Sequence, residues 1–184
     1  ALDDLVRSGR VRYLGASSMF AYQFAQVLYT ADLNGFHRFV SMQNHYNLIY
    51  REEEREMLPL CESEGVGVIP WSPLARGRLT RRPSEYRATT RGRSDGMADD
   101  WYDGEDDDAV AEAVVSLAEE RGDAPAQVAL AWLLHQSAVT APIVGATKMQ
   151  HLEDAVRGAE LTLSDEERAR LEAPYRPHPV KGHR

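Results

Sequence analysis

The chain has 184 residues, with 29 acidic and 21 basic side chains and a formal net charge of −8. This acidic balance argues against nucleic acid as a partner, and no apolar run approaches the roughly 18–20 residues of a membrane span. The single cysteine, Cys61, excludes an internal disulfide and favours a reducing, cytoplasmic location. Because the chain starts at Ala1 inside a helical pattern, we expect a preceding segment to be missing.

The predicted elements alternate along the chain. Short apolar segments predict strands at 11–15, 39–42, 66–69 and 140–144, and helical spacing predicts helices at 2–8, 22–30, 53–64, 109–121, 126–135, 152–158 and 164–172. Gly9, Gly65 and Gly122 are the expected helix stops, and Ser164 is the expected N-cap of the last helix. This alternation favours an α/β fold with a parallel sheet and right-handed crossovers.

The segment 66–78 opens as an apolar strand, breaks at Pro70 and continues as a loop that contains Trp71, Arg76 and Arg78. Glycine and arginine in such a loop suit an anionic ligand, and an aromatic face can stack on a flat ring. A core strand followed by a solvated basic turn is the alternative, and the segment alone leaves both open.

Polar clusters directly follow all four predicted strands, at Ser17–Ser18, Gln43–Asn44, Trp71–Ser72 and 145–148. In parallel α/β folds the carboxyl ends of the strands form the ligand face. Neither the Gly-x-Gly-x-x-Gly fingerprint nor the P-loop pattern is present. A barrel therefore fits better than a doubly wound sheet, but four strands are half of what a (β/α)₈ barrel needs.

Four ordered motifs carry a resemblance to a known family: 13–19 (YLGASSM), 42–48 (MQNHYNL), 70–77 (PWSPLARG) and 142–154, which begins PIVGATK. They are similar to the second half of an aldo-keto reductase, a (β/α)₈ barrel that reduces carbonyls with NADPH. The resemblance implies a partial TIM barrel with four parallel strands, corresponding to strands five to eight. It places this half barrel at 1–173, followed by an extended tail at 174–184.

The resemblance also implies roles for the strand-end residues toward NADP(H). Ser17, Ser18 and Gln43 match positions that hydrogen-bond the nicotinamide carboxamide, although most members have Asn in place of Ser18. Trp71 matches the aromatic residue that stacks under the nicotinamide. The remaining matches are Ser72, Pro73, Leu74, Ala75 and Arg76 along the pyrophosphate, Gly145, Thr147 and Lys148 at the adenosine phosphate, and His151 and Asp154 at the adenine. Ala155 replaces an adenine contact with a side chain that cannot hydrogen-bond.

The catalytic Asp, Tyr, Lys and His of the family lie on its first four strands, so the resemblance implies no catalytic residue in this chain. His45 and Tyr46 could imitate an acid pair, but a place behind the cofactor-binding residues or along the substrate fits their position better. The histidines show no metal spacing. We therefore predict an NADPH-dependent oxidoreductase half that is inactive alone and acts on a small carbonyl when completed. The alternative is a non-catalytic NADPH- or partner-binding module or an inactive truncated remnant.

Two charged stretches and two bare sheet edges complete the expectations. Arginines at 81–93 suggest a flexible flap over the cofactor phosphates in an intact barrel, or a disordered loop in this chain alone. The acidic run at 99–108 is expected to solvate a loop and to supply acids before the helix at Ala109. Because a half barrel exposes its edges, we expect self-association or a partly molten state.

Overall fold

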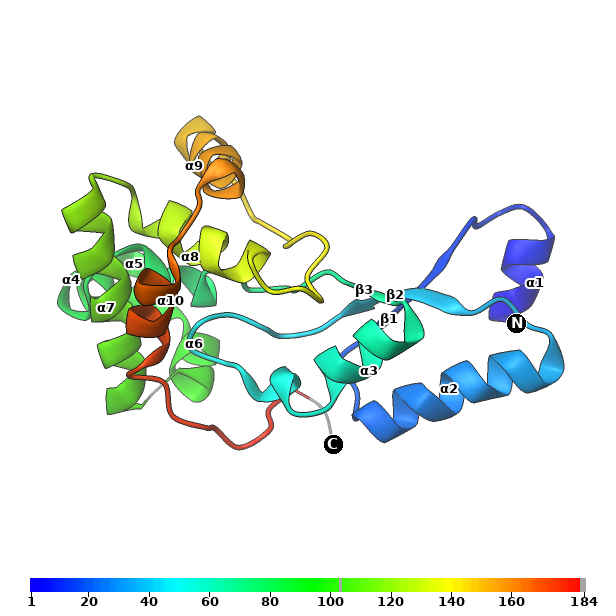
Figure 1. Cartoon of the computed structure of the whole chain (residues 1–184). Helices are drawn as coiled ribbons and strands as arrows, with labels where there is room; N and C mark the ends of the chain where they lie inside the picture. The colour runs from blue at the N-terminus through cyan, green and yellow to red at the C-terminus, as the bar shows by residue number, and fades with distance from the viewer. Residues whose placement is uncertain (103, 183–184) are drawn as a thin grey trace.

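The structure is a computed structural model that describes residues 1–102 and 104–182 (Figure 1). Three parallel strands form the sheet in the order β1-β2-β3, namely β1 (Leu14–Ser17), β2 (Phe39–Gln43) and β3 (Gly67–Val68). Ala16 is paired with Met42, which is paired with Val68, and these three side chains belong to the buried core. The chain therefore has the α/β architecture with a parallel sheet that the alternation predicts.

Helices connect the strands. The segment α1 (Leu2–Arg7) precedes the sheet, α2 (Ala21–Asn34) links β1 to β2, and η1 (Glu52–Glu54) with α3 (Met57–Glu64) links β2 to β3. Phe24 and Leu28 on α2 are fully buried. Both α2 and α3 end at a glycine with positive φ, Gly35 at 62° and Gly65 at 67°, a conformation that glycine adopts without strain.

The fourth predicted strand, 140–144, is wrong as a strand. Within the described residues it forms no strand, and the nearest pairing is an isolated parallel bridge between Val68 and Val139, just before it. Its backbone still follows β3, because Thr140 N donates to Val68 O at 2.8 Å and Ile143 N donates to Pro70 O at 2.8 Å. Pro142 has no N–H to donate, which weakens a ladder at this point. The segment thus keeps the position of a fourth strand without its regular pairing.

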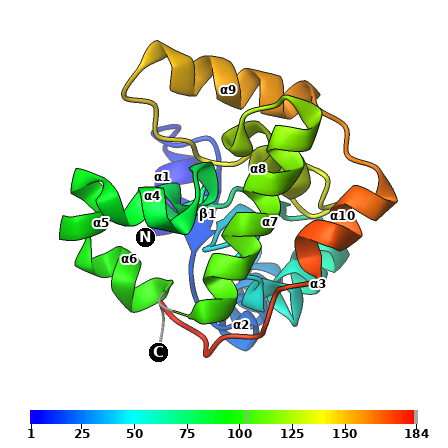
Figure 2. The ribbon, with the colours of Figure 1, turned by 90° about the vertical axis from the view of Figure 1, so that its left-hand side faces the viewer.

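The second half of the chain is mainly helical (Figure 2). It contains η2 (Ala75–Thr80), α4 (Pro83–Ala88), α5 (Thr90–Ser94), α6 (Gly96–Trp101), α7 (Glu105–Arg121), α8 (Pro125–Leu134), α9 (Met149–Glu160) and α10 (Asp165–Glu172). The stretch 81–93, expected as a flap or a disordered loop, is largely helical. Pro83 occupies the first turn of α4, where its missing N–H costs no bond. Ser164 caps α10 as predicted, with its Oγ accepting from Glu167 N.

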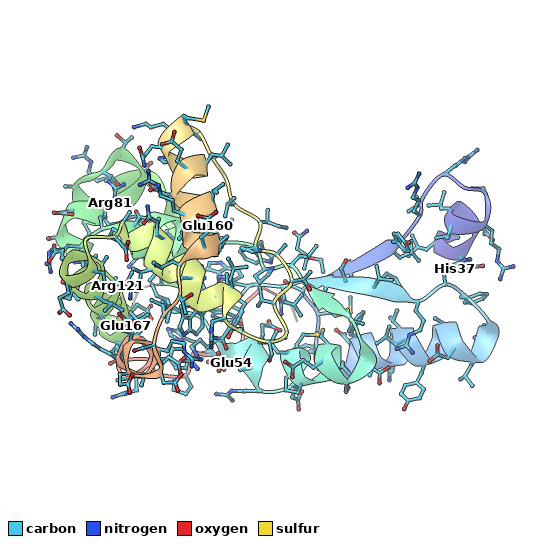
Figure 3. All side chains as sticks on the ribbon, turned by 45° about the horizontal axis from the view of Figure 1, so that its top comes forward. His37, Glu54, Arg81, Arg121, Glu160 and Glu167 are labelled. Carbon is cyan, nitrogen blue, oxygen red and sulfur yellow. The ribbon has the colours of Figure 1, made fainter. Side chains whose placement is uncertain are left out.

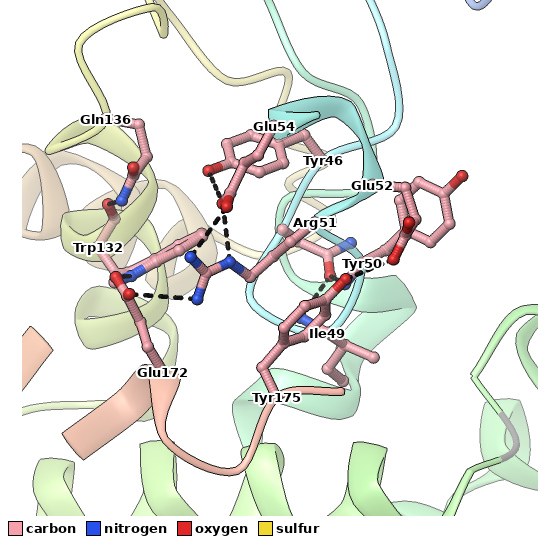
Figure 4. A network of polar contacts seen from close by, with 11 residues as sticks. Tyr46, Ile49, Tyr50, Arg51, Glu52, Glu54, Trp132, Gln136, Glu172 and Tyr175 are labelled. Carbon is pink, nitrogen blue, oxygen red and sulfur yellow. Dashed lines mark hydrogen bonds and ion pairs between the residues drawn. The ribbon is translucent and has the colours of Figure 1, made fainter. Parts of the chain in front are cut away.

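A polar network joins η1 to α8 and α10 (Figure 4). Arg51 pairs with Glu54 at 2.7 Å and with Glu172 at 3.3 Å, and its guanidinium lies 5.3 Å from the Trp132 ring centroid. The Tyr175 ring lies on the guanidinium too, at 5.1 Å. We call the set Tyr46, Arg51, Glu54, Trp132, Glu172 and Tyr175 the Arg51 network. Its charges are paired and its Tyr46 and Trp132 rings are buried, so it fixes α8 and α10 to the segment that follows β2.

The opposite end of the molecule, made of α1, β1 and α2, is open. A groove of about 840 Å³ lies between these elements, and Tyr22, Tyr29 and Leu33 on α2 are exposed. Figure 3 shows His37 at this end, where its backbone N–H and its ring contact Asp3. Within the described residues no helix is both long and apolar enough to cross a membrane. We refer to α1, β1 and α2 as the open end.

The tail after α10 has neither helix nor strand between 175 and 182. It is nevertheless fixed at several points. Tyr175 Oη donates to Glu52, His178 Nε2 lies 2.7 Å from Asp107 Oδ1, and Lys181 N donates to Tyr50 Oη at 3.0 Å. These contacts tie the tail to η1 and to the first turn of α7.

Candidate functional site at the strand ends

The first two strand ends are joined through the backbone of Gln43. Ser17 Oγ donates to Gln43 O at 3.0 Å, and Ser18 N donates to the same oxygen at 3.1 Å. The indole N–H of Trp71 in turn donates to Ser18 Oγ at 3.3 Å. The structure therefore brings together the four residues that the family resemblance associates with a nicotinamide ring.

The remaining strand ends continue this row. Trp71 forms a parallel bridge with His45, and the backbone N–H of Trp71 donates to Asn44 O at 2.9 Å. On the other side, the bond from Ile143 to Pro70 places the start of the segment 143–148 beside the Trp71 loop. The four polar clusters consequently lie at the same edge of the sheet, as the position of each cluster directly after a predicted strand indicates.

Aromatic rings form a cluster at this edge. The Trp71 and His45 rings are parallel within 13° at 4.4 Å, and His45 and Tyr50 are parallel within 16° at 4.3 Å. Trp101 lies edge-on, 4.5 Å from His45 and 5.2 Å from Trp71. Sequence reasoning treated Trp101 and Tyr102 as part of a solvating acidic run, which is wrong for these two side chains. Two adjacent aromatic residues within an acidic stretch were the available signal.

A buried hydrogen-bond network holds the His45 ring. Its Nε2 contacts Tyr102 Oη, and Asn47 Nδ2 donates to Tyr102 Oη at 3.2 Å and to Ser72 O at 2.9 Å. Burial, together with the charges of His178 and Lys181, lowers the pKa of His45 to about 3. The imidazole is therefore neutral at physiological pH. Burial likewise raises the pKa of Tyr102 above its ordinary value, so its phenol stays protonated at neutral pH and is a weaker acid than a free tyrosine.

The loop after Trp71 has an unusual backbone. Ser72, Ala75 and Arg76 have positive φ angles of 54°, 45° and 56°, which non-glycine residues adopt rarely and at a cost. Pro73 and Ala75 are buried and Leu74 is half-buried. The Arg76 guanidinium pairs with Asp95 at 2.7 Å, so part of its charge is compensated within the chain.

The segment that carries the other predicted phosphate and adenine residues is more open. Gly145, Thr147, Lys148 and His151 are exposed, and His151 Nδ1 accepts from Thr147 N at 3.4 Å. Asp154 is different, because its Oδ1 accepts from Gln127 at 2.7 Å and from Gln150 at 3.1 Å. Its carboxylate thus links α8 to α9.

The geometry defines a class: an α/β protein whose parallel strands present polar and aromatic side chains at their carboxyl ends, the ligand face of such folds. The aldo/keto reductase family model matches residues 1–176. This chain belongs to the aldo/keto reductase family.

Several curated relatives share the family. An aldo-keto reductase of Fusarium vanettenii is 49% identical over 185 residues, which cover 100% of this chain and 49% of the relative. A putative aryl-alcohol dehydrogenase of Schizosaccharomyces pombe is 47% identical, over 99% of this chain and 51% of its own length. The versiconal hemiacetal acetate reductase of Aspergillus parasiticus is 45% identical, over 98% and 53%. The chain therefore spans about half the length of these oxidoreductases.

Proposed function

We propose that this chain is the NADP(H)-binding half of a carbonyl reductase, equivalent to strands five to eight of the barrel. The convergence of Ser17, Ser18, Gln43 and Trp71 at one sheet edge supports the proposal most strongly. Two polar groups there are available to a ligand. Within the described chain, neither the Gln43 amide nor the Lys148 ammonium makes a side-chain hydrogen bond or ion pair, and Gly145 has open space where a Cβ would lie.

Each residue then has a role in binding or orientation. Ser17, Ser18 and Gln43 orient the carboxamide, and Trp71 supports the nicotinamide ring, which supplies the hydride when NADPH is bound. The strained 72–76 loop follows the pyrophosphate. Lys148 favours a 2′-phosphate by charge. The remaining positions, Gly145, Thr147, His151 and Asp154, face the adenosine part, with Asp154 already engaged by two glutamines.

The proton donor is proposed to lie outside this chain. Tyr46 is fully buried and donates to Glu54 at 2.6 Å, and burial raises its pKa above its ordinary value. His45 is neutral and bonded to Tyr102. Neither can act as the acid that carbonyl reduction requires. The chain alone is therefore proposed to be inactive, and a small carbonyl substrate to bind only when the other half of the barrel is present.

The open end and the exposed Met149, Leu152 and Val156 on α9 support self-association or completion by the other half. We also propose a reducing, cytoplasmic setting for this enzyme, because its single cysteine cannot form an internal disulfide. The competing candidate is a non-catalytic nucleotide- or partner-binding module, favoured by the burial of His45 and Tyr46, the two candidate acids at the described strand ends.

Titration with NADPH and NADH tests the binding proposal. We expect NADPH to quench tryptophan fluorescence and Lys148→Ala to weaken NADPH binding about tenfold, since one charge-assisted contact is worth about 1.5 kcal/mol. NADH binding should change little. Arg12→Ala is the matched control, because this exposed cation precedes β1 and therefore lies away from the carboxyl ends of the strands. Absence of binding by a folded sample, or equal effects of the two substitutions, contradicts the site.

Joining or co-expressing the chain with the first half of a relative tests the placement in the barrel. We expect NADPH oxidation with an aromatic aldehyde only in the presence of that half. If the second half of a relative restores activity instead, the chain corresponds to the first half. Turnover by the chain alone overturns the assignment of the proton donor to the other half.

A further inference from the structure

Three rings form a column at the strand-end site, with Tyr50 at one end, His45 in the middle and Trp71 at the other end. The interplanar angles of 16° and 13° keep the three rings nearly parallel. Such stacked pairs contribute beyond the area they bury. His45 therefore determines the plane in which the indole of Trp71 lies.

Among the described residues, His45 is the one ring that stacks parallel on Trp71, so no second ring lies parallel on the other face of the indole. The indole N–H of Trp71 donates to Ser18 Oγ at 3.3 Å. Because this N–H lies in the ring plane, the hydrogen bond occupies the edge of the ring and not a face. Trp101 meets it at 66°, edge to face, while also contacting His45 and Tyr50. Among the ring contacts of the described residues, those of Trp71 are with His45 and Trp101, and the indole is only partly buried. A flat ring on this second face would extend the column.

We propose that His45 is a positioning residue that holds the indole of Trp71 parallel to an incoming nicotinamide, so that the cofactor becomes the fourth ring of the column. This inference rests on the proposed function.

The environment of His45 fits support and not acid–base chemistry. The side chain is 1% exposed, and its Nδ1 has no hydrogen-bond partner in the described chain. Its Nε2 is held by Tyr102, so the ring cannot rotate freely. Because the imidazole stays neutral, it adds a flat polarisable surface without a charge. Leaving a ring nitrogen unpaired costs free energy, and the stack on both faces offsets part of that cost.

Ligands with and without a nicotinamide test the inference. His45→Leu removes the ring and His45→Phe keeps it, with His45→Met as a second non-aromatic variant if the leucine variant does not fold. The probes are NADPH and 2′,5′-ADP, which has the 2′-phosphate but no nicotinamide. We expect His45→Leu to weaken NADPH binding roughly fivefold, the loss of one ring stack. We expect His45→Leu to leave the affinity for 2′,5′-ADP unchanged within about twofold. His45→Phe should restore the affinity for NADPH.

A measurement without any ligand separates this inference from the proposed function. The near-ultraviolet circular dichroism of the indoles should change in His45→Leu and be retained in His45→Phe, with unchanged far-ultraviolet spectra in both. An unchanged indole spectrum in His45→Leu, or equal weakening of both probes, overturns the positioning role. A wild-type chain that binds neither probe overturns the proposed function and, with it, the fourth ring of the column.

Discussion

The Arg51 network and the open end differ in how far their side chains are buried and paired with other side chains of the chain. In the network, Trp132 and Tyr46 are fully buried, and Arg51 contacts two carboxylates and two rings. At the open end, Leu33 is 84% exposed and Tyr13 is 73% exposed. One region contains its own partners, whereas the other presents apolar side chains to solvent.

This difference shows which part of the chain can be stable by itself. Buried apolar side chains hold the helical half against the sheet, and the paired charges of the Arg51 network add to this (Figure 4). Exposed apolar side chains on α2 contribute little to the free energy of unfolding of one molecule. We therefore expect substitutions to have large effects in the network and small effects at the open end.

The largest effect is expected for Arg51→Met. The substitution removes two ion pairs and two cation–π contacts and leaves Glu54 and Glu172 near each other without a cation. We expect a loss of about 3 kcal/mol in the free energy of unfolding, measured by urea denaturation. Arg12→Met, at an exposed position before β1, is the matched control and should change stability by less than about 0.5 kcal/mol. Equal effects would mean that the network is not a distinct stabilising unit.

A pH-dependent effect is expected for Glu53, the neighbour of Glu54 on η1. Its side chain is buried at 6% exposure, and burial raises its pKa to about 7 from 4.5. A raised pKa in the folded state gives stability that is present below 4.5 and is lost as pH rises through about 7. Relative to Glu53→Gln, the wild-type chain should lose about 3 kcal/mol between pH 4.5 and roughly pH 8. Parallel pH profiles of the two proteins would contradict a buried, ionising carboxyl.

The smallest effect is expected for Leu33→Ser on α2. With 84% of its surface exposed, the side chain loses little burial, and the free energy of unfolding should change by less than about 0.5 kcal/mol. Self-association should decrease instead, as measured by sedimentation velocity. A large loss of monomer stability would show that the open end is more packed than its exposure indicates.

Periodicity and caps predicted much of the fold. Ser164 begins α10, and Gly65 and Gly122 end α3 and α7, because capping depends on residues close in sequence. The prediction of a strand at 140–144 was wrong. The segment has an apolar composition, but it contains Pro142, which cannot donate a backbone hydrogen bond and so limits pairing. In the arginine-rich stretch 81–93, the charges led to the prediction of a loop. Pro83, which lies in the first turn of α4, was the available signal for a helix start.

The site was predictable where it depends on position after a strand. Ser17, Gln43 and Trp71 meet because parallel strands end at one edge. The contacts of Trp101 and Tyr102 depend on how α6 packs against residues more than fifty positions earlier, such as His45. Local sequence does not contain that information, so the contacts of Trp101 and Tyr102 with His45 could not be anticipated.

The order of the strands has a consequence for how the chain folds. Because β1, β2 and β3 are neighbours in the same order as in the sequence, each strand can dock on the one made just before it. Closing one crossover at a time keeps the entropic cost of each step modest. During synthesis, the sheet can therefore grow from β1 onward while later segments are still on the ribosome.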